Sequence, residues 1–198
     1  MGFFGFGKKT PQDPQPAAPA AATSSPIQSQ LSAVEALKLG PIFQPSTRSD
    51  PDAPMGPFFK RSDFYRSDTA TKLGIDNRPT PAAWAELERV AMFAHCLRLA
   101  IGKPLIVSSG FRCPALNKAV GGVANSAHQF GLALDLQCPG MSNQALGEAA
   151  AALFRAAGMS WDQIIEEKNP SGASWLHVAL PASGQYGREQ IFSLRPDH

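Results

Sequence analysis

Ten of the chain's 18 prolines lie in the stretch from Pro11 to Pro57, and this concentration limits where a folded core can form. The same stretch contains alanine-rich and serine-rich runs, such as the one from Pro16 to Ala22. Segments of this composition are extended and semi-rigid, and they offer few side chains to a core. We therefore expect residues 1–56 to form an arm or linker and residues 57–198 to form one folded domain.

Two parts of the arm depart from this composition. Leu31, Val34 and Leu37 have helical spacing and predict a short helix within residues 28–39. It is either a docking helix for a partner or a nascent helix, because a helix of this length is marginal alone in water. The three phenylalanines of residues 1–9 form a candidate anchor onto another protein, or a sticky disordered tip. This segment is too short to span a bilayer, and its lysines follow the apolar residues, so we expect no transmembrane segment and no signal peptide.

The remainder of the chain has the pattern of an α+β domain. Thr80 and Pro81 are a good helix start, and Ser142 and Gly158 are the expected cap and stop of a second helix. Short apolar runs predict strands, and these are Pro104 to Ser108, Leu132 to Leu136, Asp162 to Glu167 and Trp175 to Leu180. We expect a small antiparallel sheet covered by helices.

Two histidines and an aspartate form a candidate metal site. His128 and Asp135 are seven residues apart, and His177 lies in the last of the predicted strands. A catalytic zinc ion takes about three nitrogen or oxygen ligands from the protein and keeps one position open. The alternative is that both histidines are satisfied core residues. The spacing alone leaves both interpretations open, and in the first of them one zinc ion binds His128, Asp135 and His177 on a face of the sheet.

The residues around these ligands resemble a known family. Three motifs occur in order, and they are Ser109-Gly110-Phe111-Arg112, Ser126-x-His128-x-x-Gly131-x-Ala133-x-Asp135 and Trp175-x-His177-Val178. They are similar to those of the zinc peptidases that cut peptidoglycan stem peptides. That family includes D-alanyl-D-alanine carboxypeptidases, D-Ala-D-Ala dipeptidases and phage L-alanyl-D-glutamate endopeptidases. The resemblance begins near Phe58, where the entry segment Phe64 to Asn77 is similar to the phage-type branch, and it continues to about Ser193.

The resemblance implies roles for individual residues. It implies that His128, Asp135 and His177 bind zinc. Arg112 matches the family's arginine, whose guanidinium can bind a substrate carboxylate or stabilise an oxyanion, and the alternative is a structural salt bridge. Ser126 matches a position that contacts substrate in relatives, although a serine there can equally be a turn or capping residue.

The general base is the point where this chain departs from part of the family. Many members have an acidic residue three positions before the last histidine, and here that residue is Ser174. In the phage-type branch a Gln-Leu-Ile-x-Glu strand precedes the last ligand, and Gln163 to Glu167 is similar to it. Glu167 is therefore the expected base, and strand alternation places Glu166, the fallback, on the other face. Either glutamate can instead be a solvated carboxylate, and the chain would then bind metal without being an effective peptidase.

Together these features predict zinc-dependent hydrolysis of an amide bond in peptidoglycan stem peptides. The sequence does not distinguish a carboxypeptidase from an endopeptidase. The phage-type likeness and the arm favour a phage-derived lysin or a virion-attached enzyme, with residues 1–56 contacting phage structural proteins. Such an enzyme acts in the periplasm or cell wall, from the virion or after release by lysis. The alternative is a non-catalytic structural or binding component of a phage particle. A formal charge of +2 and a pI near 8.5 are too small to indicate nucleic-acid binding.

Overall fold

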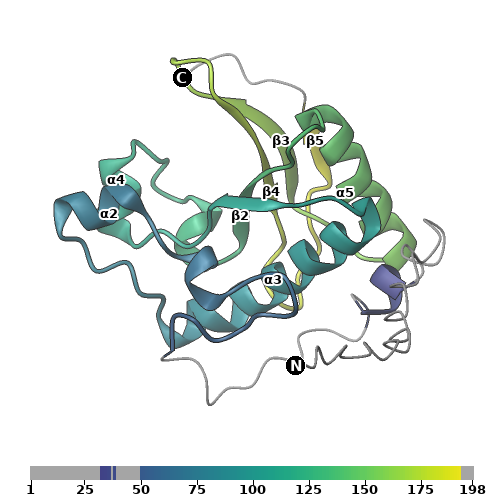
Figure 1. Cartoon of the computed structure of the whole chain (residues 1–198), viewed down its shortest axis with the longest axis horizontal. Coiled ribbons are helices and arrows are strands. Elements are labelled where there is room, and N and C mark those ends of the chain that lie inside the picture. The colour runs from purple at the N-terminus through teal and green to yellow at the C-terminus, as the bar shows by residue number, and fades with distance from the viewer. Residues whose placement is uncertain (1–31, 37, 39–49, 193–198) are drawn as a thin grey trace, which may run out of the picture.

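The computed structural model describes residues 32–36, 38 and 50–192, and its centre is a five-stranded sheet (Figure 1). The strand order is β1-β2-β4-β3-β5. The strands are β1 (Ile106–Ser109), β2 (Ala133–Gln137), β3 (Gln163–Lys168), β4 (Ser174–Ala179) and β5 (Gln190–Phe192). The first four pair antiparallel, as predicted, and β5 joins β3 in parallel. The predicted α+β fold is confirmed, with one correction, because the sheet has a parallel edge strand of three residues that the sequence analysis did not predict.

Two long helices, α3 (Pro81–Ile101) and α5 (Asn143–Ala157), pack on one face of the sheet. Both have local start signals, because the side chain of Thr80 accepts a hydrogen bond from the backbone of Ala83 and that of Ser142 accepts one from Ala145. The two helices contact each other where the rings of Phe93 and Phe154 stack with centroids 4.4 Å apart. The sheet contributes the apolar side chains of one face to this core, and these are Leu134, Leu136, Ile164, Leu176 and Val178.

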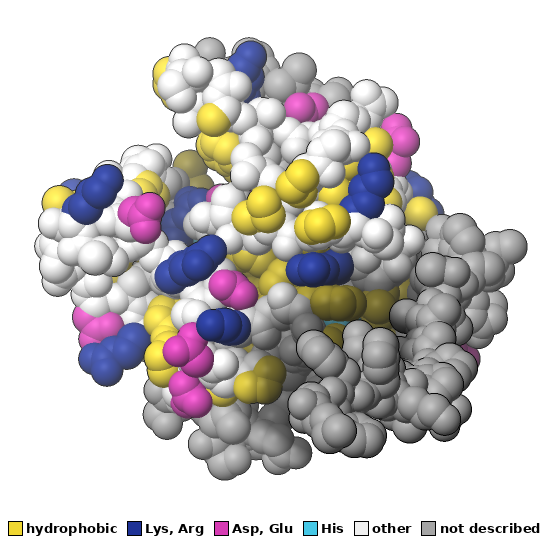
Figure 2. Space-filling view, in the orientation of Figure 1, with side chains coloured by type: hydrophobic (Ala, Val, Ile, Leu, Met, Phe, Trp, Pro, Cys, Tyr) yellow, Lys and Arg dark blue, Asp and Glu magenta, His cyan; other side chains and the backbone are white. Residues whose placement is uncertain are grey.

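Four short elements lie beside β1 and β2 or pack on one another. They are η2 (Arg61–Phe64), α2 (Asp68–Leu73), α4 (Pro114–Ala119) and η3 (Ala127–Phe130). Figure 1 shows α2 and α4 together at the side of the molecule away from α5. On the surface drawn in Figure 2, basic and acidic side chains are interspersed rather than gathered by sign.

The segment ahead of the predicted boundary at residue 57 also contributes to the domain. Met55 is fully buried in the core, and its backbone N–H donates to the carbonyl of Phe59 at 2.8 Å. Residues 32–36 and 38, inside the predicted helix 28–39, are helical, and Ala33 is fully buried in the same core. The remaining arm, including the phenylalanines of residues 1–9, lies outside the described residues. Of the helices in the described ranges, none is both long and apolar enough to cross a membrane.

Candidate metal centre

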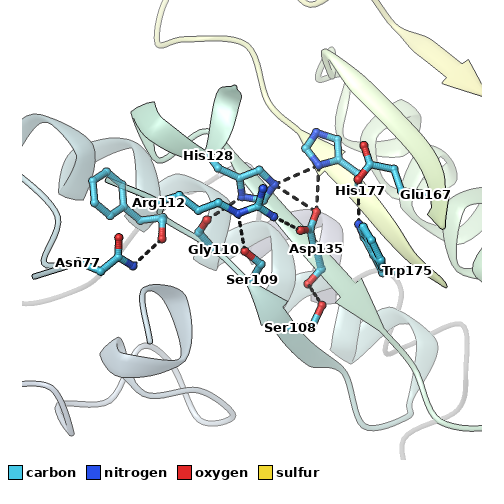
Figure 3. Close-up of polar contacts among 11 residues, drawn as sticks. Asn77, Ser108, Ser109, Gly110, Arg112, His128, Asp135, Glu167, Trp175 and His177 are labelled. Atoms are coloured by element: carbon cyan, nitrogen blue, oxygen red, sulfur yellow. Dashed lines mark hydrogen bonds and ion pairs between the residues drawn. The ribbon is translucent and has the colours of Figure 1, made fainter. Parts of the chain in front are cut away.

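Three side chains from separate elements converge on one point (Figure 3). His128 comes from η3, Asp135 from β2 and His177 from β4. Asp135 and His177 are direct partners in the β2–β4 pairing, so they lie on the same face of the sheet. This face is opposite the one that α3 and α5 cover, because the neighbouring residues Leu134 and Leu176 belong to the helix-covered core.

The three candidate ligand atoms form a nearly regular triangle. Asp135 Oδ1 lies 3.1 Å from His128 Nε2 and 3.0 Å from His177 Nδ1, and the two nitrogens are 3.2 Å apart. A tetrahedral zinc ion with bonds of about 2.0–2.1 Å needs ligand atoms roughly 3.3 Å apart. The triangle therefore fits one such ion. In the described part of the chain, no other group of three His, Cys, Asp or Glu side chains meets in this way.

A backbone carbonyl orients the first histidine. His128 Nδ1 lies 2.6 Å from the carbonyl oxygen of Gly110, so this nitrogen carries the proton and Nε2 presents its lone pair to the metal position. Gly110 is required here, because a Cβ at this position would lie 2.2 Å from the carbonyl oxygen of Phe64. The glycine of the Ser-Gly-Phe-Arg motif thus holds the tautomer of a histidine that lies 18 residues further along the chain.

A second glycine, Gly131, forms the tight turn between His128 and Asp135. Gly131 ends η3 with φ of 74°, and a Cβ there would lie 2.4 Å from the carbonyl oxygen of Ala83 in α3. Such a left-handed conformation costs glycine little and other residues more. The chain therefore turns tightly from η3 into β2, and Asp135 returns to the side of His128.

The site is buried, and its protonation states suit a cation. His128, Asp135 and His177 are 2%, 3% and 7% exposed. Burial alone would raise the pKa of the Asp135 carboxyl, but the charge of His128 and the contacts with both histidines hold that pKa well below its usual range. Burial lowers the pKa of His128, although Asp135 opposes the shift. Both shifts favour the forms that bind a metal ion, which are a carboxylate and a neutral imidazole.

Arg112 is engaged with the metal centre itself. Its Nη2 donates to Asp135 Oδ2, the oxygen that does not face the histidines, and its Nε donates to Ser109 Oγ at 2.9 Å. Arg112 thus forms a salt bridge with Asp135, which is the structural role given above as the alternative to substrate binding. The salt bridge fixes the second oxygen of the carboxylate ligand. Ser126, the other predicted substrate contact, is buried at the start of η3, where its side chain makes no capping hydrogen bond. A direct contact of either residue with substrate stays a prediction.

The two candidate bases point to opposite faces of β3. Ile165 pairs with His177 and Glu167 with Trp175, so Glu167 shares the face of the metal ligands. Its carboxylate accepts a hydrogen bond from Trp175 Nε1 at 2.9 Å, and Figure 3 shows it beside His177. Glu166 pairs with Leu176 on the helix-covered face.

Ser174 also lies away from the ligands. Asn143 Nδ2, at the start of α5, lies 3.0 Å from Ser174 Oγ and 3.4 Å from Glu166 Oε1. The residue three positions before the last histidine is therefore turned toward α5, together with Glu166. The role of Trp175 as a partner of Glu167 was not predicted, because it depends on the exact pairing of β3 with β4.

A sequence model of one known family matches this chain. The family is described as peptidase M15, and the match covers residues 57–164, which is more than half of the chain. The matched region includes the entry segment, Arg112, His128 and Asp135, and it ends before Glu167 and His177. No curated protein sequence matches. The resemblance drawn from the three motifs is confirmed, and the chain belongs to the peptidase M15 family of zinc-dependent peptidases.

Proposed function

We propose that this protein is a zinc-dependent peptidase that hydrolyses an amide bond in the peptide part of peptidoglycan. The observation that carries the proposal is the convergence of three ligand atoms within 3.0 to 3.2 Å of one another, on the sheet face that Glu167 shares. Membership of the peptidase M15 family supports the same chemistry.

His128, Asp135 and His177 would hold the zinc ion. When bound, zinc polarises the scissile carbonyl and lowers the pKa of the attacking water. Glu167 accepts the proton of that water, and the indole N–H of Trp175 holds the carboxylate in position. Proton acceptance by a positioned carboxylate contributes a factor of about 10² to 10⁴ in rate.

Arg112 has two tasks in this mechanism. Its contact with Asp135 Oδ2 keeps Oδ1 directed at the metal position. Two of its three nitrogens are engaged, by Asp135 and Ser109, so a substrate carboxylate or a developing oxyanion would meet the third. Ser126 precedes His128 by two residues and is the further candidate for substrate contact.

The biological setting that we propose is a bacteriophage. The protein is a phage-derived lysin or a virion-attached enzyme, which acts on the cell wall from the particle or after lysis. Support comes from the phage-type entry segment and from the tether-like composition of residues 1–56, which suit contact with phage structural proteins.

A non-catalytic structural component is the second candidate. The observation that favours it is Ser174, which stands where many relatives have an acidic residue and is turned toward Asn143 of α5. A chain that uses the fold only for assembly would bind zinc and release nothing from peptidoglycan.

The test is mass spectrometry of fragments released from purified peptidoglycan by the zinc-loaded full chain. A chelated sample and the His128→Ala variant are the controls. Chelator-sensitive release of defined stem-peptide fragments is the expected result, and the fragment masses distinguish a carboxypeptidase from an endopeptidase. Absence of release by folded, zinc-loaded protein across several peptidoglycan chemotypes would overturn the enzymatic proposal and favour the structural one.

A further inference from the structure

We infer that Asn77 is a positioning residue of the metal centre and that it acts by fixing the backbone on both sides of Arg112. Asn77 lies between α2 and α3, is 7% exposed and uses its whole side-chain amide. Its Nδ2 donates to the carbonyl of Tyr65 at 2.6 Å and to that of Phe111 at 2.9 Å. Its Oδ1 accepts the backbone N–H of Cys113 at 2.7 Å.

The two contacts with residues 111 and 113 bracket Arg112. The carbonyl of Phe111 and the N–H of Cys113 belong to the peptide groups before and after this arginine, and one planar amide binds both. The N–H of Arg112 itself donates to the carbonyl of His128 at 3.1 Å. Both backbone dihedrals of Arg112 are therefore restrained, and so is the direction in which its side chain leaves the loop.

A short chain of contacts then reaches the metal position. Arg112 binds Asp135 Oδ2 and Ser109 Oγ, and Asp135 Oδ1 is a ligand atom. Figure 3 shows the bond of Asn77 to the carbonyl of the residue before Arg112, and the bonds of Arg112 to Ser109 and Asp135. Replacing a residue that hydrogen-bonds to a metal ligand, without binding the metal itself, typically weakens metal affinity by about 10- to 100-fold. Asn77 is one residue further out, so we expect a change near the lower end of that range.

A structural role alone would produce a different outcome. The entry segment is already tied to the arginine loop by the N–H of Phe111, which donates to the carbonyl of Phe64 at 2.7 Å. If Asn77 only joined these segments, its loss would lower stability without a specific effect at Arg112. If it acts through Arg112, its effect on zinc binding disappears once the arginine is removed.

The first experiment measures local order in metal-free full chain and depends on neither zinc nor turnover. Hydrogen exchange is followed by NMR at the Nε–H of Arg112 and the backbone N–H of Cys113. Asn77→Ala is compared with Leu153→Ala, a core variant in α5 that serves as the control for lost stability. We expect at least tenfold faster exchange at both positions in Asn77→Ala, relative to the control after correction for global stability. Equal exchange in the two variants would overturn the inference.

The second experiment measures zinc affinity by competition with a chromophoric chelator, in a cycle of Asn77→Ala, Arg112→Ala and the double variant. We expect about tenfold weaker binding in Asn77→Ala and no further loss when it is added to Arg112→Ala. Losses that multiply would overturn the inference. The inference rests on the proposed metal centre, but the two fail separately. Wild-type protein that binds no zinc refutes the proposed function, and the exchange measurement still decides the role of Asn77.

Discussion

The two faces of the central sheet carry different kinds of side chain. The face under α3 and α5 is mainly apolar, and Leu134, Leu136 and Leu176 are buried there. The opposite face carries Asp135 and His177, one residue away from these leucines in the chain. Consecutive strand residues point to opposite faces. A residue that stabilises the core and a residue that serves as a metal ligand are therefore neighbours in the same strand. Neighbouring residues can therefore be substituted to affect one property and leave the other.

The largest contrast is expected between His177→Ala and Leu176→Ala. A zinc site binds with about 10–16 kcal/mol in total, so loss of one ligand should weaken zinc binding by on the order of 10²- to 10³-fold. Leu176→Ala should instead lower the free energy of unfolding by about 2–5 kcal/mol, because it leaves a cavity under the helices. Chelator competition and urea denaturation measure the two effects. Equal loss of zinc affinity in both folded variants would contradict the separation of the faces.

The next contrast tests the two glutamates of β3. Glu167→Gln should lower kcat by about 10²- to 10⁴-fold, because the amide cannot accept the proton of the attacking water. Glu166→Gln should leave kcat close to the wild-type value, because this side chain faces Asn143. Initial rates of fragment release, measured at equal zinc loading, compare the two variants. A larger loss in Glu166→Gln would assign the base to the other face.

A smaller effect is expected for the indole that supports Glu167. Trp175→Phe keeps an aromatic ring and removes the N–H that donates to Glu167. A hydrogen bond of this kind is worth about 0.5–1.5 kcal/mol, so kcat should fall by roughly 2- to 10-fold while zinc affinity stays constant. Steady-state kinetics and chelator competition on the same preparation give both quantities. A kcat equal to that of the wild type would remove Trp175 from the mechanism.

The smallest effect is expected at the edge of the sheet, outside both faces. Arg188 donates to Asp162 Oδ1 at 2.8 Å and holds the pKa of that carboxyl below its ordinary value. Because the pKa of Asp162 is lower in the folded state, the ion pair adds to the free energy of unfolding at pH values above the ordinary pKa of about 3.9. This stabilisation is lost as the pH falls through the lowered pKa of the folded state. Arg188→Gln should cost less than about 1 kcal/mol at pH 7, since the pair is partly exposed. Denaturation curves should show that Arg188→Gln lowers the free energy of unfolding more at pH 7 than at pH 3. A larger loss of unfolding free energy at pH 3 would contradict this prediction.

Local signals account for the parts of the fold that could be predicted. The starts of α3 and α5 were predicted because Thr80 and Ser142 bond to backbone groups three residues ahead. The grouping of His128, Asp135 and His177 was predicted from the motifs and their likeness to a family. These features depend on short segments whose pattern is visible in the chain itself.

The features that could not be predicted depend on exact strand register, on contacts between distant segments or on a very short strand. The contact of Glu167 with Trp175 depends on how β3 and β4 align across their connecting turn. The contacts of Asn77 with Phe111 and Cys113 span 34 and 36 residues and leave no periodic pattern. Strand β5 has three residues, too few for an alternation of apolar and polar side chains to be recognised.

The pairing of Ile165 with His177 also determines where this protein can gain or lose residues. Deleting one residue between Gln163 and Glu167 would shift the strand by one position and present Glu166 to the metal in place of Glu167. The turn at Asn169, closed by the bond from its N–H to the carbonyl of Ala173, lies outside this constraint. Insertions in homologues and engineered tags are therefore expected in that turn, whereas the spacing within β3 should be invariant.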